Sequence, residues 1–169
     1  GLGGHCIPID PFYLTWKVRE YGQETRFIEL AGEVNTAMPA YVFQRCGEAL
    51  AQSRQTISGS RILMIGIAYK ANVDDDRESP AYVLLEMLEK QGAQVEYYDP
   101  HVPVIRPSRE HAQFAGRKSA VLTAETMRTD FLDLWSDGRM PIQGVVLVTH
   151  NIEEAVLMCD RVLVFGSNP

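Results

Sequence analysis

Cys6 lies in a segment whose residue types suit nucleophilic catalysis. Residues 3–11 read Gly-Gly-His-Cys-Ile-Pro-Ile-Asp-Pro. Gly3 and Gly4 carry no Cβ, so their backbone N–H groups can approach a substrate or an oxyanion closely. A thiolate is a strong nucleophile and a good leaving group, and Asp10 follows four residues later as a nearby acid/base group. A buried cysteine in a Gly/Pro turn is the structural alternative, and the flanking chemistry favours the catalytic interpretation.

A second segment combines cations with a predicted helix start. Residues 66–80 read Gly-Ile-Ala-Tyr-Lys-Ala-Asn-Val-Asp-Asp-Asp-Arg-Glu-Ser-Pro. Lys70 and Arg77 follow an apolar, strand-type run over 61–68, and open α/β sheets bind ligands at the carboxyl ends of their strands. The helix that opens at Ser79 adds N–H donors and a positive dipole end. The pattern predicts a pyrophosphate site, although the three aspartates at 74–76 also fit a solvated run of charges.

The helices and strands that must position these residues are those of an α/β fold. Apolar spacing predicts a short helix over 12–21 and a long amphipathic helix over 27–50, which Pro39 kinks or divides. Ser79-Pro80 and Gly92 bound a helix between strands at 61–68 and 94–98, and Asp99-Pro100 ends the second strand. This βαβ unit requires a parallel sheet. Further along we expect helices over 124–135 and 152–159 and strands over 144–149 and 161–165. The predicted fold is a helical segment followed by a Rossmann-like parallel sheet domain.

Composition excludes several classes of protein. The 169 residues carry a net charge of −6, with no basic stripe that would bind nucleic acid. No apolar run is long enough to cross a membrane. The three widely spaced cysteines fit a reduced, cytoplasmic chain without a disulfide framework or a metal site. Cys46, Cys159, Trp16 and Trp135 are interpreted as packing residues, and His101 and His111 lack metal-ligand spacing. Because Gly1 already lies within a motif, we expect a piece of a longer protein.

The Cys6 segment resembles the active site of the UDP-glucose/GDP-mannose dehydrogenase family, in the variant found in bacterial UDP-N-acetylhexosamine 6-dehydrogenases. Residues 66–80 resemble the start of the same family's UDP-binding domain. The resemblance implies oxidation of a UDP-sugar, such as UDP-N-acetylglucosamine, to the uronic acid by two hydride transfers to NAD through a thioester on Cys6. It also implies a homodimer formed through the central helix, and further catalytic residues and the main NAD-binding domain upstream of Gly1.

The same resemblance assigns roles to individual residues. Cys6 and Asp10 would be catalytic. Gly3, Gly4, Tyr69 and Lys70 would bind the substrate, and His5 and Arg77 would contact NAD. The domains would be a helical region over 1–56, with the active-site loop, and a UDP-binding domain over 57–169. By itself the chain should neither reduce NAD nor hydrolyse ATP.

The tail after about residue 121 is similar to another family. Residues 148–155 (Val-Thr-His-Asn-Ile-Glu-Glu-Ala) and 159–162 resemble the ATPase subunits of nitrate/sulfonate/taurine-type ABC transporters. In that family the histidine at the position of His150 senses the ATP γ-phosphate, but no P-loop precedes it here. Two alternatives therefore stay open, a fragment of an ABC ATPase and an inactive nucleotide-binding or dimerisation module.

Overall fold

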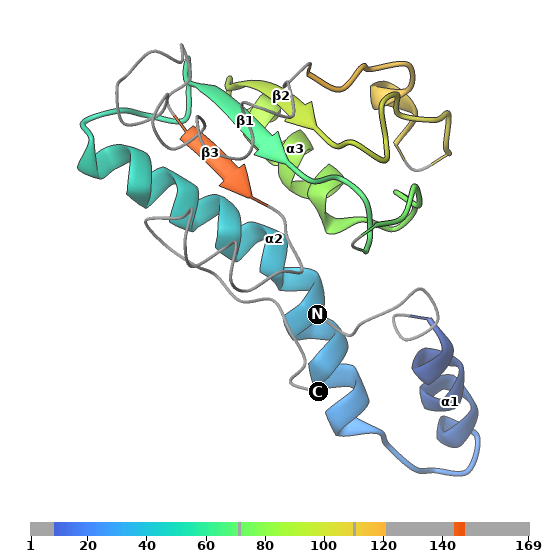
Figure 1. Ribbon diagram of the computed structural model, residues 1–169. Coiled ribbons are helices and arrows are strands. Elements are labelled where there is room, and N and C mark those ends of the chain that lie inside the picture. The colour runs from blue at the N-terminus through green and yellow to red at the C-terminus, as the bar shows by residue number, and fades with distance from the viewer. Residues whose placement is uncertain (1–8, 71, 110, 121–143, 148–169) are drawn as a thin grey trace.

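The computed structural model of the chain describes residues 9–70, 72–109, 111–120 and 144–147. Within them the predicted helices, the βαβ unit and the strand from residue 144 are present. The other predicted elements, over 124–135, 152–159 and 161–165, lie outside the described residues. The elements in chain order are α1 (Asp10–Arg19), α2 (Arg26–Gln52), β1 (Arg61–Ile65), α3 (Pro80–Lys90), β2 (Gln94–Tyr98), a 3₁₀ turn (Ala112–Phe114) and β3 (Gly144–Leu147) (Figure 1).

The three described strands form a parallel sheet in the order β2-β1-β3. Ile65 at the end of β1 pairs with Tyr98 of β2 on one side and with Leu147 of β3 on the other. The central strand β1 is a continuous buried run after its first residue, whereas β2 alternates between exposed and buried side chains. A buried central strand with a helical crossover confirms the predicted α/β, Rossmann-like fold class.

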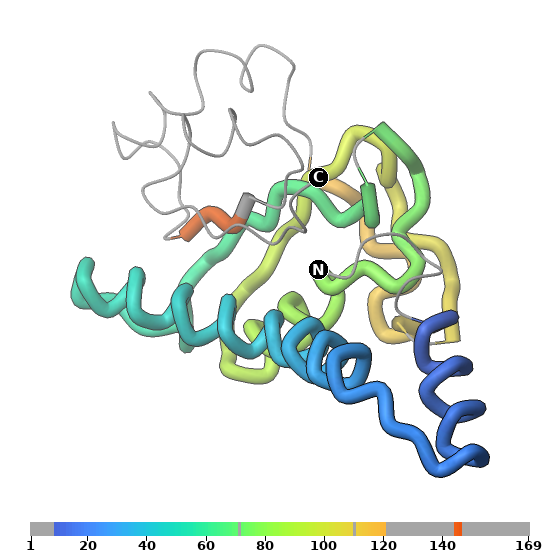
Figure 2. Tube along the Cα trace, turned by 90° about the horizontal axis from the view of Figure 1, so that it is seen from below, coloured from blue at the N-terminus to red at the C-terminus, as the bar shows by residue number. Residues whose placement is uncertain are grey.

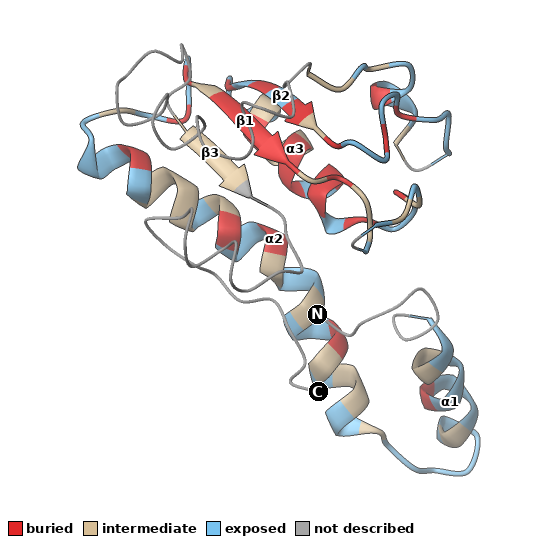
Figure 3. Cartoon of the chain, in the orientation of Figure 1, coloured by how far each residue is buried: buried red, intermediate tan, exposed pale blue. Residues whose placement is uncertain are grey.

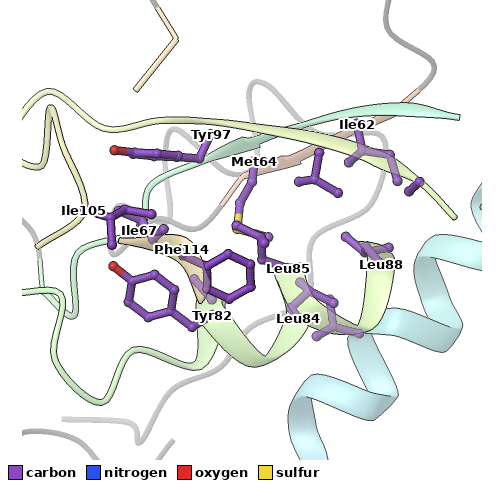
Figure 4. Packing of buried hydrophobic residues seen from close by; sticks show 14 of the residues in the cluster. Ile62, Met64, Ile67, Tyr82, Leu84, Leu85, Leu88, Tyr97, Ile105 and Phe114 are labelled. Atoms are coloured by element: carbon purple, nitrogen blue, oxygen red, sulfur yellow. The ribbon is translucent and has the colours of Figure 1, made fainter. Parts of the chain in front are cut away.

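The core fills the space between the sheet and α3 (Figure 4). Met64 and Tyr97 from the strands and Leu85 and Leu88 from α3 are fully buried. Burying one such side chain stabilises the fold by about 1.5–3 kcal/mol, so this contact dominates the stability of the described part. The Tyr82 ring stacks on His111, with ring centroids 4.2 Å apart, which gives that histidine a packing role.

Helix α3 begins and ends as its sequence predicts. The Ser79 hydroxyl accepts from the Ala81 N–H at 3.3 Å, and Pro80 occupies the first helical position, where its missing N–H costs nothing. Gly92 follows the helix with φ +89°, a left-handed conformation that other residues adopt only with strain. These signals set the length of the crossover between β1 and β2.

Helix α2 runs without interruption through Pro39, so of the two predicted alternatives, a kink or a division into two helices, the division is wrong. Its two halves differ in surroundings (Figure 3). Val42 and Leu50 in the second half are buried in the core cluster that α3 and the sheet also form, whereas Phe27, Leu30 and Val34 in the first half are exposed, Phe27 by 90%. The predicted apolar stripe is therefore buried in the second half of α2 and exposed in the first half. No described helix has both the length and the apolar character needed to cross a membrane.

Helix α1 packs on the first half of α2, at the end that projects away from the sheet (Figures 1 and 2). Gly32 of α2 leaves room for the Phe12 ring, since a Cβ at Gly32 would clash with that ring. The Thr25 hydroxyl donates to the Thr15 hydroxyl at 2.7 Å beside this contact. Trp16 is 63% exposed, so its interpretation as a packing residue is wrong for the described part of the chain.

Candidate functional site

The candidate site lies at the carboxyl end of β1, where the strand order reverses. β2 and β3 lie on opposite sides of β1, and ligands of open α/β sheets bind at such a switch point. Gly66 turns the chain out of the strand with φ +90°, and its N–H donates to the Tyr98 carbonyl at 2.8 Å. Tyr69 and the exposed Lys70 follow this turn. The tertiary structure thus places the predicted ligand-binding lysine at the edge where ligands are expected.

The loop that carries these residues closes on itself before α3 begins. The Tyr69 N–H donates to the Asp75 carbonyl at 2.7 Å. Asp76 is buried, and its carboxylate accepts from the Tyr82 hydroxyl of α3 at 2.5 Å. Burial raises the pKa of Tyr82, and the hydrogen bond to Asp76 acts in the same direction. Tyr82 therefore stays a proton donor, and it ties the end of the loop to the helix.

Asp74 and Asp75, the first two of the three aspartates at 74–76, each form an ion pair with an arginine. Arg77 pairs with Asp75 through two bonds, Nε–Oδ1 and Nη2–Oδ2, each 2.9 Å long. Arg106, from the segment after β2, pairs with Asp74 at 2.6 Å, and this hydrogen bond lowers the pKa of the Asp74 carboxyl. These pairs are exposed, and exposed ion pairs contribute little to stability. Either guanidinium can therefore exchange its carboxylate for an anionic ligand at small cost.

Another carboxylate at this edge is buried. Asp99 follows β2, is 4% exposed, and accepts four backbone N–H groups. Oδ2 accepts from Ile67 and Ala68 at 2.8 and 2.9 Å, and Oδ1 accepts from His101 and Val102 at 2.8 and 3.2 Å. From the sequence, Asp99-Pro100 predicts only the end of a strand. An aspartate directly after the second strand of a βαβ unit was the available signal.

The site residues predicted from the sequence fall into three groups. Tyr69, Lys70 and Arg77 lie together on the loop after β1, where burial raises the pKa of the Tyr69 hydroxyl. Asp10 is exposed at the start of α1, which packs on the end of α2 remote from the sheet. The remaining four lie outside the described residues: Gly3, Gly4, His5 and Cys6. Among the described residues no group of three or more His, Cys, Asp or Glu side chains is arranged to hold a metal ion.

Comparison with known protein families gives two matches along the chain. Residues 63–166 match the UDP-binding domain of the UDP-glucose/GDP-mannose dehydrogenase family, and residues 1–37 match its central domain. The first match contains the loop after β1 and all three described strands except the beginning of β1. It continues well past residue 121, where the sequence suggested a change to an ABC-type ATPase. The matches therefore assign residues 1–37 and 63–166 to the dehydrogenase family.

Relatives with known names agree with the family matches. The chain is 43% identical over 102 residues to UDP-N-acetyl-D-mannosamine dehydrogenase of Methanococcus maripaludis, covering 60% of this chain and 22% of that protein. It is 36% identical over 152 residues to the enzyme of that name from Pyrococcus horikoshii, covering 90% and 35%. The structure of NDP-N-acetyl-D-galactosaminuronic acid dehydrogenase from Methanosarcina mazei aligns with TM-score 0.67 and 25% identity, covering 92% of this chain and 30% of that one. The chain thus spans about a fifth to a third of such relatives.

Proposed function

Because this chain belongs to the UDP-glucose/GDP-mannose dehydrogenase family, we propose that it is the C-terminal part of a UDP-sugar 6-dehydrogenase and that the loop after β1 binds the UDP. The observation that carries the proposal is the position of Lys70, at the carboxyl end of the central strand and within the match to the UDP-binding domain. An ammonium group there can donate charge-assisted hydrogen bonds to a diphosphate. Tyr69 lies beside it and is assigned to the same substrate.

The binding of UDP tests this proposal on the chain itself. We expect UDP, and not ATP, to bind in a calorimetric titration. Lys70→Ala should weaken UDP binding by about 1.5–3 kcal/mol, the range for a charge-assisted hydrogen bond. Lys90→Ala is the matched control, because it removes the same charge at the far end of α3. Unchanged UDP affinity in Lys70→Ala would contradict the assignment, and tighter binding of ATP than of UDP would favour the ATPase alternative.

In the proposed reaction the C6 hydroxymethyl group of the sugar loses four electrons. The first oxidation removes a hydride from C6 and the hydroxyl proton, which gives an aldehyde. The Cys6 thiolate adds to the aldehyde carbon, and the resulting thiohemiacetal loses a second hydride to become a thioester. Water then attacks the acyl carbon, the C–S bond breaks, and the thiolate leaves as the carboxylate forms. Two NAD⁺ and one water are consumed, and two NADH and three protons are released.

Cys6 and Asp10 have separate roles in this reaction. Cys6 forms the covalent bond, and Asp10 orients or deprotonates the attacking water. In the full-length enzyme, Cys6→Ser should permit the first oxidation weakly and abolish formation of the acid. Asp10→Asn should slow hydrolysis, so that a thioester accumulates and can be trapped with hydroxylamine. Full production of the uronic acid by Cys6→Ser would exclude the covalent route.

NAD, when bound by the whole enzyme, accepts the hydride in each oxidation. The described residues do not form a dinucleotide site of their own. In dinucleotide-binding folds an acid after the second strand binds the ribose hydroxyls, and here the carboxylate at that place, Asp99, accepts four backbone N–H groups instead. We propose that two residues contact NAD. Arg77 is one of the described residues, and His5 lies outside them. We expect no NADH from the isolated chain incubated with UDP-N-acetylglucosamine and NAD.

The sugar is proposed to be an N-acetylhexosamine, with UDP-N-acetylglucosamine as the first candidate. The Cys6 motif supports this class, as do the relatives named for UDP-N-acetyl-D-mannosamine. Those two sugars differ in configuration at C2. Measuring kcat/KM of the full-length enzyme with both UDP-sugars and with UDP-glucose ranks the three substrates. A preference for UDP-glucose would contradict the proposed class. We place the enzyme in the cytoplasm, which suits the free thiol of Cys46.

The proposed assembly is a homodimer formed through α2. Its first half carries exposed apolar side chains, and an apolar helix face of this kind is a protein contact surface. Replacing Leu30 and Val34 together with Glu should give monomers in sedimentation velocity. Val42 is unsuitable for this test because it is only 6% exposed and belongs to the core. The control replaces Thr36 and Ala40 with Glu, exposed positions on another face of α2, and an unchanged dimer in the first variant would contradict the proposal.

A further inference from the structure

The Asp99 carboxylate joins two strand-end segments that are more than thirty residues apart in the chain. One oxygen accepts from Ile67 and Ala68 after β1, and the other accepts from His101 and Val102 after β2. A buried charge is costly unless hydrogen bonds compensate it, and the four N–H donors supply that compensation. The carboxylate is therefore neither exposed nor available to a ligand's hydroxyl groups.

These bonds fix the beginning of the loop that carries Lys70. Gly66 is held by its N–H bond to the Tyr98 carbonyl, and Asp99 then holds the next two residues. The other end of the loop is held by the buried Asp76, which accepts from the Tyr82 hydroxyl. Between these ends Lys70, Asn72 and Asp74 are exposed, and Lys70 stands two residues beyond the last N–H that Asp99 accepts.

We propose that Asp99 is a positioning residue of the UDP site, because the carboxylate holds the backbone of Ile67 and Ala68 and thereby sets where Tyr69 and Lys70 meet the nucleotide. The inference rests on the proposed function, in that the ligand positioned is UDP. A displaced lysine keeps its charge but loses the geometry of its charge-assisted hydrogen bonds, which need a short donor–acceptor distance and a nearly linear angle. The proposal therefore predicts that a substitution at Asp99 weakens UDP binding although Lys70 itself is not substituted.

The variant Asp99→Asn tests this role. It keeps the size of the side chain but turns an NH₂ group toward one pair of backbone N–H donors, so that pair is released. We expect UDP affinity in calorimetry to fall about tenfold, the loss for one charge-assisted hydrogen bond. Ile62→Val is the matched control, since Ile62 is buried at the opposite end of β1. It should lower the unfolding midpoint and leave UDP affinity unchanged.

Amide hydrogen exchange of the unmodified chain supplies a readout that needs no variant. Ile67 and Ala68 lie beyond the end of β1, yet their N–H groups should exchange more slowly than that of the exposed Lys70 by about a hundredfold or more. In Asp99→Asn this protection should be lost at one or both residues. Should Asp99→Asn fail to fold, Ser119→Ala removes the hydroxyl that accepts from the Asp99 N–H at 3.0 Å, and UDP affinity should fall about threefold.

The outcomes separate this inference from the proposed function. If the unmodified chain does not bind UDP, the proposed function fails, and the inference about UDP falls with it. If the chain binds UDP and folded Asp99→Asn binds it within a factor of two, the positioning role is overturned while the UDP site stands. Amide exchange at Ile67 and Ala68 as fast as at Lys70 would also overturn it, because their hydrogen bonds to Asp99 would then be open in solution.

Discussion

The unit made of β1, α3 and β2 and the pair made of α1 and the first half of α2 stabilise themselves in different ways. In the former, large side chains are fully buried, and the carboxylates of Asp76 and Asp99 are buried with hydrogen-bond partners. In the latter, most large apolar side chains are exposed, and the ion pairs lie at the surface. The helical pair therefore leaves most of its large apolar surface exposed, whereas the sheet unit contains its own core.

The largest expected effect tests the difference in core packing. Leu88→Ala removes a fully buried side chain from α3 and should lower the free energy of unfolding by about 2–5 kcal/mol. Phe27→Ala, at a position 90% exposed, should change the stability of the monomer by less than about 0.5 kcal/mol. Urea unfolding of both variants at low protein concentration measures this contrast. Equal losses would mean that the first half of α2 is covered in the free monomer.

Alkaline unfolding should act through the tyrosines of the sheet unit. Burial raises the pKa of Tyr97 to about 12 and, together with the hydrogen bond to Asp76, raises that of Tyr82. Between pH 10 and 12 the unfolded chain loses these protons and the folded chain keeps them, so stability is complete below pH 10 and falls across that range. Tyr97→Phe should reduce the fall in urea titrations, and Tyr13→Phe, at an exposed ring of α1, should not. A fall that Tyr97→Phe leaves unaltered would contradict this reading.

Removing one buried hydrogen bond should have a smaller effect than removing a core side chain. Tyr82→Phe keeps the ring but takes away the donor to Asp76, leaving a buried carboxylate without this partner. We expect a loss of about 1–3 kcal/mol in the free energy of unfolding. The variant Tyr82→Phe with Asp76→Asn removes the charge as well and should recover part of that loss. If the loss in the double variant equals the sum of the losses in the two single variants, the pair does not act as a unit.

The smallest expected effect lies where α1 meets α2. Gly32→Ala gains about 1 kcal/mol of helix propensity, but the new Cβ clashes with the Phe12 ring and pushes α1 away. The two contributions nearly cancel in the free energy of unfolding, while cleavage in the 20–25 turn by a protease should become faster. Gly32→Ala combined with Phe12→Ala removes the clash and keeps the propensity gain. Unchanged cleavage in Gly32→Ala would mean that the ring turns aside without moving α1.

Local signals in the sequence predicted most of the described elements. The spacing of apolar residues located α2, the Ser79-Pro80 pair and Gly92 bounded α3, and the alternating run over 94–98 located β2. These features depend on hydrogen bonds and side chains a few residues apart, so a linear pattern contains them. The resemblance of residues 66–80 to a UDP-binding domain was confirmed by the family match, but the change of family expected near residue 121 was not.

Contacts between distant segments decided the rest. The sequence determined that α2 is a long amphipathic helix, yet only the packing of α3 against it separated Val42, in the core, from the exposed Val34. Likewise, Asp-Pro after a strand predicted an end, and only the parallel register of β1 and β2 brought the Asp99 carboxylate under the N–H groups of residues 67 and 68. Burial and hydrogen-bond partners across thirty residues are properties of the assembled sheet, because strand pairing creates them.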